Sequence, residues 1–181
     1  MNTEEIIIAI IRVGGALPVL HWAFAGALIA IAVDLSDLFQ MNLLDLGGVS
    51  NYQALDKWLD ASYMITFFIV ALRWQGLSRT IAVMLFGFRV VGFAIFELTG
   101  ERWVLVVFPN AFEFWFLFIA WVRHYRPTLQ LHSRTALLCL IPVIALKEAH
   151  ELILHGWRGL DNYTAVGLVE SWWQWLLVWP K

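Results

Sequence analysis

The sequence predicts an all-α fold, a polytopic transmembrane bundle of about six helices with a tryptophan-rich helix at the C-terminus. Hydrophobic residues make up 61% of the chain and charged residues only 14%, whereas soluble domains carry about 45–50% apolar and about 25% charged residues. The apolar residues form runs that approach the roughly 20 residues a spanning helix needs. The runs lack the alternating polarity of a transmembrane strand, so the spans are expected to be helical.

The first two expected spans are bounded by residues that end or interrupt a helix. The first run, 6–20, is short, carries Arg12 inside it and includes Pro18, which cannot donate a helical hydrogen bond. Whether this run crosses the bilayer or lies along it stays open. The second run, 21–39, leads into the polar stretch 42–53, whose glycine, serine and asparagine residues are typical of a loop.

The later spans follow with short polar connections between them. The apolar runs lie at 54–73, 80–98, 104–122 and 135–154. Pro109 interrupts the third of these runs, so a break in that helix is expected. A last run, 163–179, is rich in tryptophan, which favours the membrane interface. It is either a short seventh span or an interfacial helix.

The distribution of basic residues predicts an orientation, because cytoplasmic loops carry an excess of Lys and Arg. The loops at 73–79 and 123–134 are rich in arginine and are expected on the cytoplasmic side, whereas the loop 42–53 has no Lys or Arg. The N-terminus carries Glu4 and Glu5, unlike the basic start of a signal peptide. We therefore expect one integral membrane domain, residues 1–181, that passes several times through the cell membrane.

Composition also limits the partners. The net charge is -2, with no basic tail or stripe, so the sequence indicates no nucleic-acid partner. Cys139 is the single cysteine, which rules out an internal disulfide framework. The lipid bilayer is the expected environment. The tryptophan-rich C-terminal run can anchor the chain at the interface or dock a partner subunit or a second copy.

Four aspartates form a pattern around the loop between the second and third spans. Asp34 and Asp37 are three residues apart and share a helix face, and Asp56 and Asp60, four apart, share another. If the two helices pack antiparallel, the four carboxylates converge at one membrane boundary. Such oxygen-only clusters suit hard divalent cations, here Mg²⁺ or Mn²⁺.

The order Asp-x2-Asp and then Asp-x3-Asp, with the segments 24–29 (Phe-Ala-Gly-Ala-Leu-Ile) and 55–60 (Leu-Asp-Lys-Trp-Leu-Asp), resembles the CDP-alcohol phosphatidyltransferases. The resemblance covers roughly the first seventy residues. It implies that the metal ligands are Asp34, Asp37 and Asp56. It further implies that Asp60 is the general base that deprotonates the acceptor alcohol, while the metal holds the diphosphate of a CDP-linked lipid or alcohol.

Two alternatives to an active enzyme stay open. Leu38 and Tyr52 stand where that family has glycine, which is expected of a degenerate relative with lost or altered activity. The aspartates can also be ordinary solvated residues at helix ends. A carboxylate such as Asp56 at the start of a helix is favoured by the helix dipole in any case.

A second group of polar residues falls inside the fourth and fifth spans. These residues are Arg89, Glu97, Asn110 and Glu113. A charge inside a membrane is costly and needs a partner or a water-filled cavity. Depth favours a pair between Arg89 and Glu113, since both lie well inside their spans. The pair is either a structural contact between helices or part of a proton or substrate pathway.

The sixth span ends in a third polar group. Its members are Lys147, Glu148, Glu151 and His155. The last three share one helix face and can contribute metal ligands, whereas Lys147 and Glu151 can instead pair across one turn. The sequence thus leaves two functions open. One is a metal-dependent phosphotransferase, and the other is a non-enzymatic membrane subunit or small transporter with a buried Arg/Glu core.

Overall fold

The structure is a computed structural model that describes residues 3–36, 52–101, 103–129, 131–151 and 173. The elements that it defines along the chain are all helices. They are α1 (Thr3–Ala16), the 3-10 helix η1 (Leu17–Leu20), α2 (Ala23–Leu35), α4 (Tyr52–Leu72), α5 (Leu77–Thr99), α6 (Trp103–Val107), α7 (Ala111–Tyr125) and α8 (Ser133–Glu151). The expected all-α fold class is confirmed for this part of the chain.

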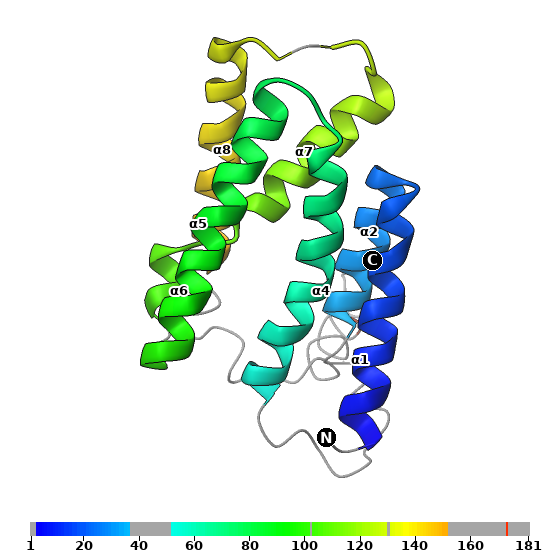
Figure 1. The fold of residues 1–181 in the computed structure, drawn as a ribbon, viewed down its shortest axis with the longest axis vertical. Coiled ribbons are helices and arrows are strands. Elements are labelled where there is room, and N and C mark those ends of the chain that lie inside the picture. Colours follow the sequence, from blue (N-terminus) through cyan, green and yellow to red (C-terminus); the bar gives the residue numbers. More distant parts are fainter. Residues whose placement is uncertain (1–2, 37–51, 102, 130, 152–172, 174–181) are drawn as a thin grey trace, which may run out of the picture.

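Helix α4 stands at the centre of the bundle. It contacts α1, η1 and α2 on one side and α5 and α7 on the other, and Figure 1 shows α1 with α2 on the opposite side of α4 from α5, α6 and α8. Helix α8 packs against α7. The sequence-distant first and sixth apolar runs are therefore joined through α4 and α7 rather than by direct contact.

The helix boundaries follow the breaks that the sequence predicts. Pro18 lies in η1, so the first apolar run is divided into an α-helix and a short 3-10 turn. The fifth run is divided at Phe108–Asn110, which separates α6 from α7 around Pro109. Gly100 ends α5 in the left-handed conformation, with φ 69°, which favours glycine because it has no Cβ.

Two predicted segments are only partly described. The expected loop 42–53 lies outside the described residues as far as 51, and Tyr52 already belongs to α4. Of the C-terminal run 163–179 only Trp173 is described, and its side chain is exposed. Helix α8 is described as far as Glu151.

An aromatic core joins α4, α5 and α7. The side chains of Phe67, Phe112, Trp115 and Phe116 are fully buried. The rings of Phe67 and Phe116 stack with centroids 4.2 Å apart, and the indole nitrogen of Trp115 donates a hydrogen bond to the Ser78 carbonyl over 3.2 Å. Burial of side chains of this size supplies most of the packing between these helices.

The surface of the bundle is apolar to an extent that water does not favour. Helix α5 has a mean hydropathy of 2.1, yet only 17% of its most apolar stretch is buried. Met84, Val91 and Leu98 on this helix are 68%, 51% and 87% exposed. Among the described residues, α5 and the stretch 103–125 are long and apolar enough to cross a membrane, and α2 is a shorter apolar helix.

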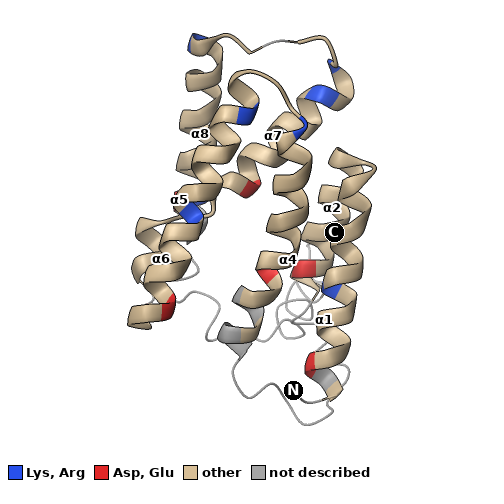
Figure 2. Cartoon of the chain, viewed as in Figure 1, with Lys and Arg blue, Asp and Glu red and all other residues tan. Residues whose placement is uncertain are grey.

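Basic residues collect at one end of the bundle. Figure 2 shows Lys and Arg mainly around the start of α8 and the end of α7, while most Asp and Glu lie in the middle or toward the opposite end. The guanidinium of Arg123 lies 5.7 Å from the ring centre of Trp74. The loops that follow α4 and α7 are therefore at the same end, as the sequence predicts.

Candidate functional site: a charged belt across the helices

Two of the four aspartates meet at a single arginine. Arg12 on α1 is only 3% exposed. Its Nη1 is in direct contact with Asp34 Oδ1 of α2, and its Nη2 donates to Asp60 Oδ1 of α4 over 3.0 Å. One guanidinium thereby ties together three helices. Two of the four carboxylates predicted to converge thus meet at one point, but a buried cationic side chain holds them there, and Asp60 lies near the middle of α4.

The Arg12 contacts bear on the predicted metal site. A guanidinium between two carboxylates offsets the repulsion between them. In a metal site, a divalent cation would have that role. Asp34 and Asp60, as they are arranged around Arg12, therefore do not fit a divalent cation unless the guanidinium moves away. Asp37 lies outside the described residues, and the side chain of Asp56 is not among those described. Within the described part of the chain, no three His, Cys, Asp or Glu side chains gather to hold a metal.

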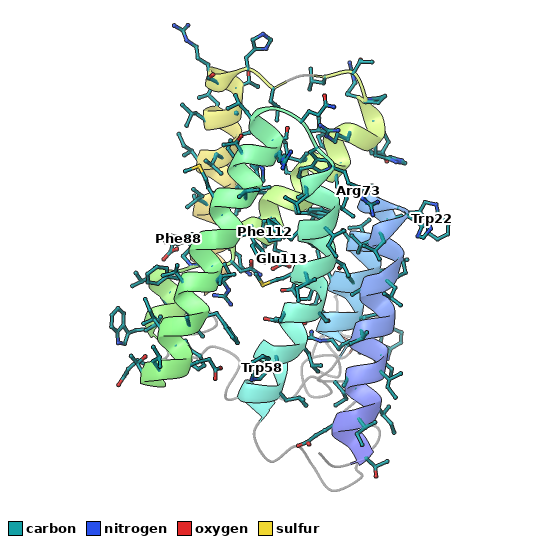
Figure 3. The ribbon with its side chains drawn as sticks, viewed as in Figure 1. Trp22, Trp58, Arg73, Phe88, Phe112 and Glu113 are labelled. Carbon is teal, nitrogen blue, oxygen red and sulfur yellow. The ribbon has the colours of Figure 1, made fainter. Side chains whose placement is uncertain are left out.

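A second polar cluster centres on Glu113, which is 8% exposed near the start of α7 and lies inside the bundle in Figure 3. Three donors approach the same oxygen, Oε2. Lys147 Nζ lies at 3.4 Å, Asn110 Nδ2 at 3.2 Å and the Tyr63 hydroxyl at 3.5 Å. These groups come from α8, the break before α7, and α4. The cluster thus joins three helices at one buried carboxylate.

The break between α6 and α7 shapes this cluster. Asn110 occupies the N-cap position of α7, yet its side chain makes no capping hydrogen bond. Its amide nitrogen donates to Glu113 and to the Tyr63 oxygen, the latter over 3.3 Å. The other side-chain atom, Oδ1, is buried and has no hydrogen-bond partner among the residues that the structure describes. A buried unsatisfied acceptor is costly, so this oxygen is able to accept a hydrogen bond from a further donor, water included.

The predicted pair between Arg89 and Glu113 is wrong. Arg89 is 7% exposed, and its Nη1 donates to the backbone carbonyl of Phe108 over 2.9 Å. That carbonyl lies at the break next to Pro109, where the helical ladder is interrupted and backbone acceptors need other donors. Glu113 pairs with Lys147 instead. The placement of Glu97 in the polar core is also wrong, because its side chain is exposed on α5.

Lys147 has a partner on another helix that the sequence analysis did not predict. It is 5% exposed, pairs with Glu113, and lies 5.2 Å from the ring centre of Phe114. The side chain of Glu151 and the whole of His155 lie outside what the structure describes, and Glu148 is partly buried. The sequence carries one signal for the pair of Lys147 with Glu113. Lys147 directly follows an apolar run, and a charge at such a position can be neutralised by a carboxylate from another span.

Tyr63 connects the two clusters and was not singled out from the sequence. It lies three residues after Asp60 on α4, and its buried hydroxyl donates to Glu113 and accepts from Asn110. We call the combined set the charged belt. Its members are Arg12, Asp34, Asp60, Tyr63, Arg89, Asn110, Glu113 and Lys147.

The charged belt is electrically balanced and lies deep in the bundle. Its three cationic and three anionic side chains sum to zero. Asp60, Arg89 and Glu113 lie near the middle of the helices or apolar stretches that carry them. The belt crosses the bundle through α1, α2, α4, α5, α7 and α8. Such an arrangement can hold charge in an apolar surrounding.

Comparison with protein-family models, with curated protein sequences and with solved structures finds no match to this chain.

Proposed function

We propose that the chain is a multi-pass protein of the cell membrane that crosses the bilayer six times. The passes are α1 with η1, then α2, α4, α5, α6 with α7, and α8. Three observations support this topology. The exposed surface of α5 is apolar, the arginine-rich loops share one end, and the charged side chains away from the ends are gathered in the belt. These features suit a bilayer better than water.

We further propose that the protein is a small transporter that carries an ion or a small polar solute through the charged belt. The observation that carries this proposal is the Glu113 cluster. Three donors compete for one carboxylate oxygen, and the neighbouring Asn110 Oδ1 is left without a partner. Buried polar groups usually have a hydrogen-bond partner, so an acceptor without one calls for an explanation. We interpret the unpaired Asn110 Oδ1 as an acceptor to which a transported hydrogen-bond donor can bind.

The length of the Lys147 contact supports an exchangeable pair. The distance from Nζ to Glu113 Oε2 is 3.4 Å, whereas a tight charge-assisted contact measures about 2.7–2.9 Å. A lysine ammonium is a compact charge on a flexible stem, so it can leave the carboxylate when another cation or a proton arrives. In this scheme Glu113 binds the transported species and Lys147 neutralises the carboxylate when the site is empty.

The broken helix gives the same indication. Discontinuous membrane helices place backbone groups and helix ends beside a binding site near the middle of the bilayer. Here the break at Phe108–Asn110 lies beside Glu113 and Tyr63. Pro109 keeps the helix open at that point because its nitrogen cannot donate. A continuous helix would close the backbone around the cluster.

The transport proposal is tested by asking whether water reaches the cluster. In a Cys139→Ala background, Asn110→Cys is treated with a small water-soluble, membrane-impermeant methanethiosulfonate reagent from each side of proteoliposomes. We expect labelling from at least one side. The control is Ala82→Cys in the same background, a fully buried position in the apolar core that should stay unlabelled. If Asn110→Cys is as inert as the control, the belt is a structural ion network and a subunit role takes the place of transport.

We keep the metal-dependent phosphotransferase as a second proposal, because Asp34 and Asp60 do converge. It requires Arg12 to leave these carboxylates so that Mg²⁺ or Mn²⁺ can approach. The test is release of CMP from a CDP-alcohol by the purified protein, with each metal and without. Activity that Asp60→Asn abolishes would favour the enzyme. The absence of CMP release with either metal would remove it.

A further inference from the structure

A pocket of about 160 Å³ lies between α4 and α5, outside the Glu113 cluster. Most of its wall is apolar, with Met64 and Ile65 from α4 and Phe86 and Phe93 from α5. Arg89 and Asp60 supply its polar part. Ile65 is 51% exposed on the outer surface of the bundle, so the pocket borders the face that the six-span topology turns toward lipid.

Arg89 differs from the other cations of the charged belt. Arg12 contacts the carboxylates of Asp34 and Asp60, and Lys147 contacts that of Glu113. Arg89 makes one hydrogen bond, to the Phe108 carbonyl, and has no carboxylate within ion-pair distance in the described part of the chain. A guanidinium carries five N–H donors. A side chain that is 7% exposed thus turns unused donors and a positive charge toward an apolar pocket.

The chemistry of the pocket selects an anion attached to a hydrocarbon chain. The guanidinium fork matches a carboxylate in bidentate geometry, while the apolar wall favours methylene groups. Asp60 borders the same pocket, but its Oδ1 accepts a hydrogen bond from Arg12, which offsets its charge. The volume is small for a complete ligand, so the rest of the chain must leave the pocket toward the bilayer.

Depth decides between a free fatty acid and a phospholipid. Arg89 lies twelve residues after Leu77 and ten before Thr99, which places it roughly 18 Å and 15 Å from the two ends of α5 at about 1.5 Å per residue. The phosphate of a phospholipid stays near the headgroup region, at the edge of a hydrocarbon core of about 30 Å. A fatty acid can enter the bilayer core as the neutral acid and pass its proton to the Asp60 carboxylate at the same pocket, which leaves the ionised fatty acid beside the guanidinium.

We propose that Arg89 binds the carboxylate of a long-chain fatty acid whose tail lies in the apolar pocket between α4 and α5. This inference goes beyond the transport proposal. It rests on the placement of the bundle in a membrane and not on any role of Glu113.

The test is equilibrium binding of radiolabelled oleate to the full-length protein in nanodiscs of neutral phospholipid. We expect saturable binding to the wild type and at least tenfold weaker binding to Arg89→Gln. The matched control is Arg73→Gln, since Arg73 is exposed at the basic end of the bundle and its loss should leave binding unchanged. Radiolabelled oleyl alcohol, with the same chain and no charge, should bind weakly and equally to wild type and Arg89→Gln.

Two further variants keep the result interpretable. Arg89→Lys retains the charge and should bind oleate more tightly than Arg89→Gln, which separates loss of the anion site from misfolding. Ala61→Phe fills the pocket and should abolish oleate binding. Equal binding of oleate by wild type and Arg89→Gln would overturn the proposal, as would displacement of oleate by phosphatidic acid at equal concentration. Glu113→Gln should bind oleate normally even if the Asn110→Cys experiment rejects transport.

Discussion

The contact between Lys147 and Glu113 gives the sharpest prediction for stability. We consider Lys147→Met, Glu113→Gln and the double variant. Met has nearly the length of Lys and no charge, so Lys147→Met leaves the Glu113 carboxylate buried with only two neutral donors, Tyr63 and Asn110. Glu113→Gln leaves a buried ammonium beside the Phe114 ring and an amide. Each single change thus removes one side of the ion pair and leaves the other side chain at a buried position.

The magnitude follows from the cost of an uncompensated buried charge. Removing one partner of a buried ion pair costs about 3–5 kcal/mol, whereas removing both is often close to neutral. The remaining donors to Glu113 place Lys147→Met at the lower end, about 3 kcal/mol. We expect the double variant to lose less stability than the two single variants added together. The coupling free energy should be about 2–3 kcal/mol, within the range for residues in direct contact.

The assay is a double-mutant cycle measured by reversible unfolding of the purified protein in mixed detergent micelles. Tryptophan fluorescence can follow the transition, because Trp115 is fully buried beside α5. A matched cycle with Lys147→Met and Glu97→Gln should show no coupling, since Glu97 is exposed on α5. Additive costs for Lys147→Met and Glu113→Gln would refute the pairing and return Lys147 to a local role within α8.

Two further changes test the packing of the bundle by thermal unfolding in detergent. Arg12→Met should cost about 3 kcal/mol because it removes the cation that Asp34 and Asp60 share, whereas Arg126→Met, at an exposed position, should stay within about 0.5 kcal/mol; equal effects would contradict the Arg12 contacts. Gly92→Ala should cost about 1–3 kcal/mol, because the added Cβ collides with the Phe108 side chain. Gly87→Ala on the same helix meets open space and should be neutral or stabilising; a Gly92→Ala variant that is equally tolerated would show that α5 and α6 pack more loosely.

Much of the helical layout can be predicted from the sequence because hydrophobic runs and breakers act locally. Pro18 and Pro109 interrupt helices where the missing N–H predicts it. Arg89, Asn110 and Glu113 also lie in the buried interior, as expected of polar residues inside apolar spans. These features depend on each residue and its neighbours along the chain.

The partners of the buried charges could not be predicted in the same way. The depth of the two residues within their spans predicted a pair between Arg89 and Glu113. In the structure, the rotation of α5 turns the Arg89 guanidinium toward the Phe108 carbonyl. The local rule that pairs Lys147 with Glu151 gives no indication of the partner on α7, Glu113. Helical periodicity shows which residues share a face but not how that face is turned toward another helix. The role of Arg12 between two aspartates was missed for the same reason.

The most direct test of the account is the side of the membrane on which two exposed positions lie. In a Cys139→Ala background, Gln75→Cys marks the basic end of the bundle and Glu101→Cys the opposite end, both at exposed positions. Intact cells are treated with a membrane-impermeant maleimide before and after permeabilisation. The account predicts that Glu101→Cys is labelled in intact cells and that Gln75→Cys is labelled only after the cells are opened. Labelling of both positions from the same side would contradict a bundle that holds its charged belt inside the bilayer.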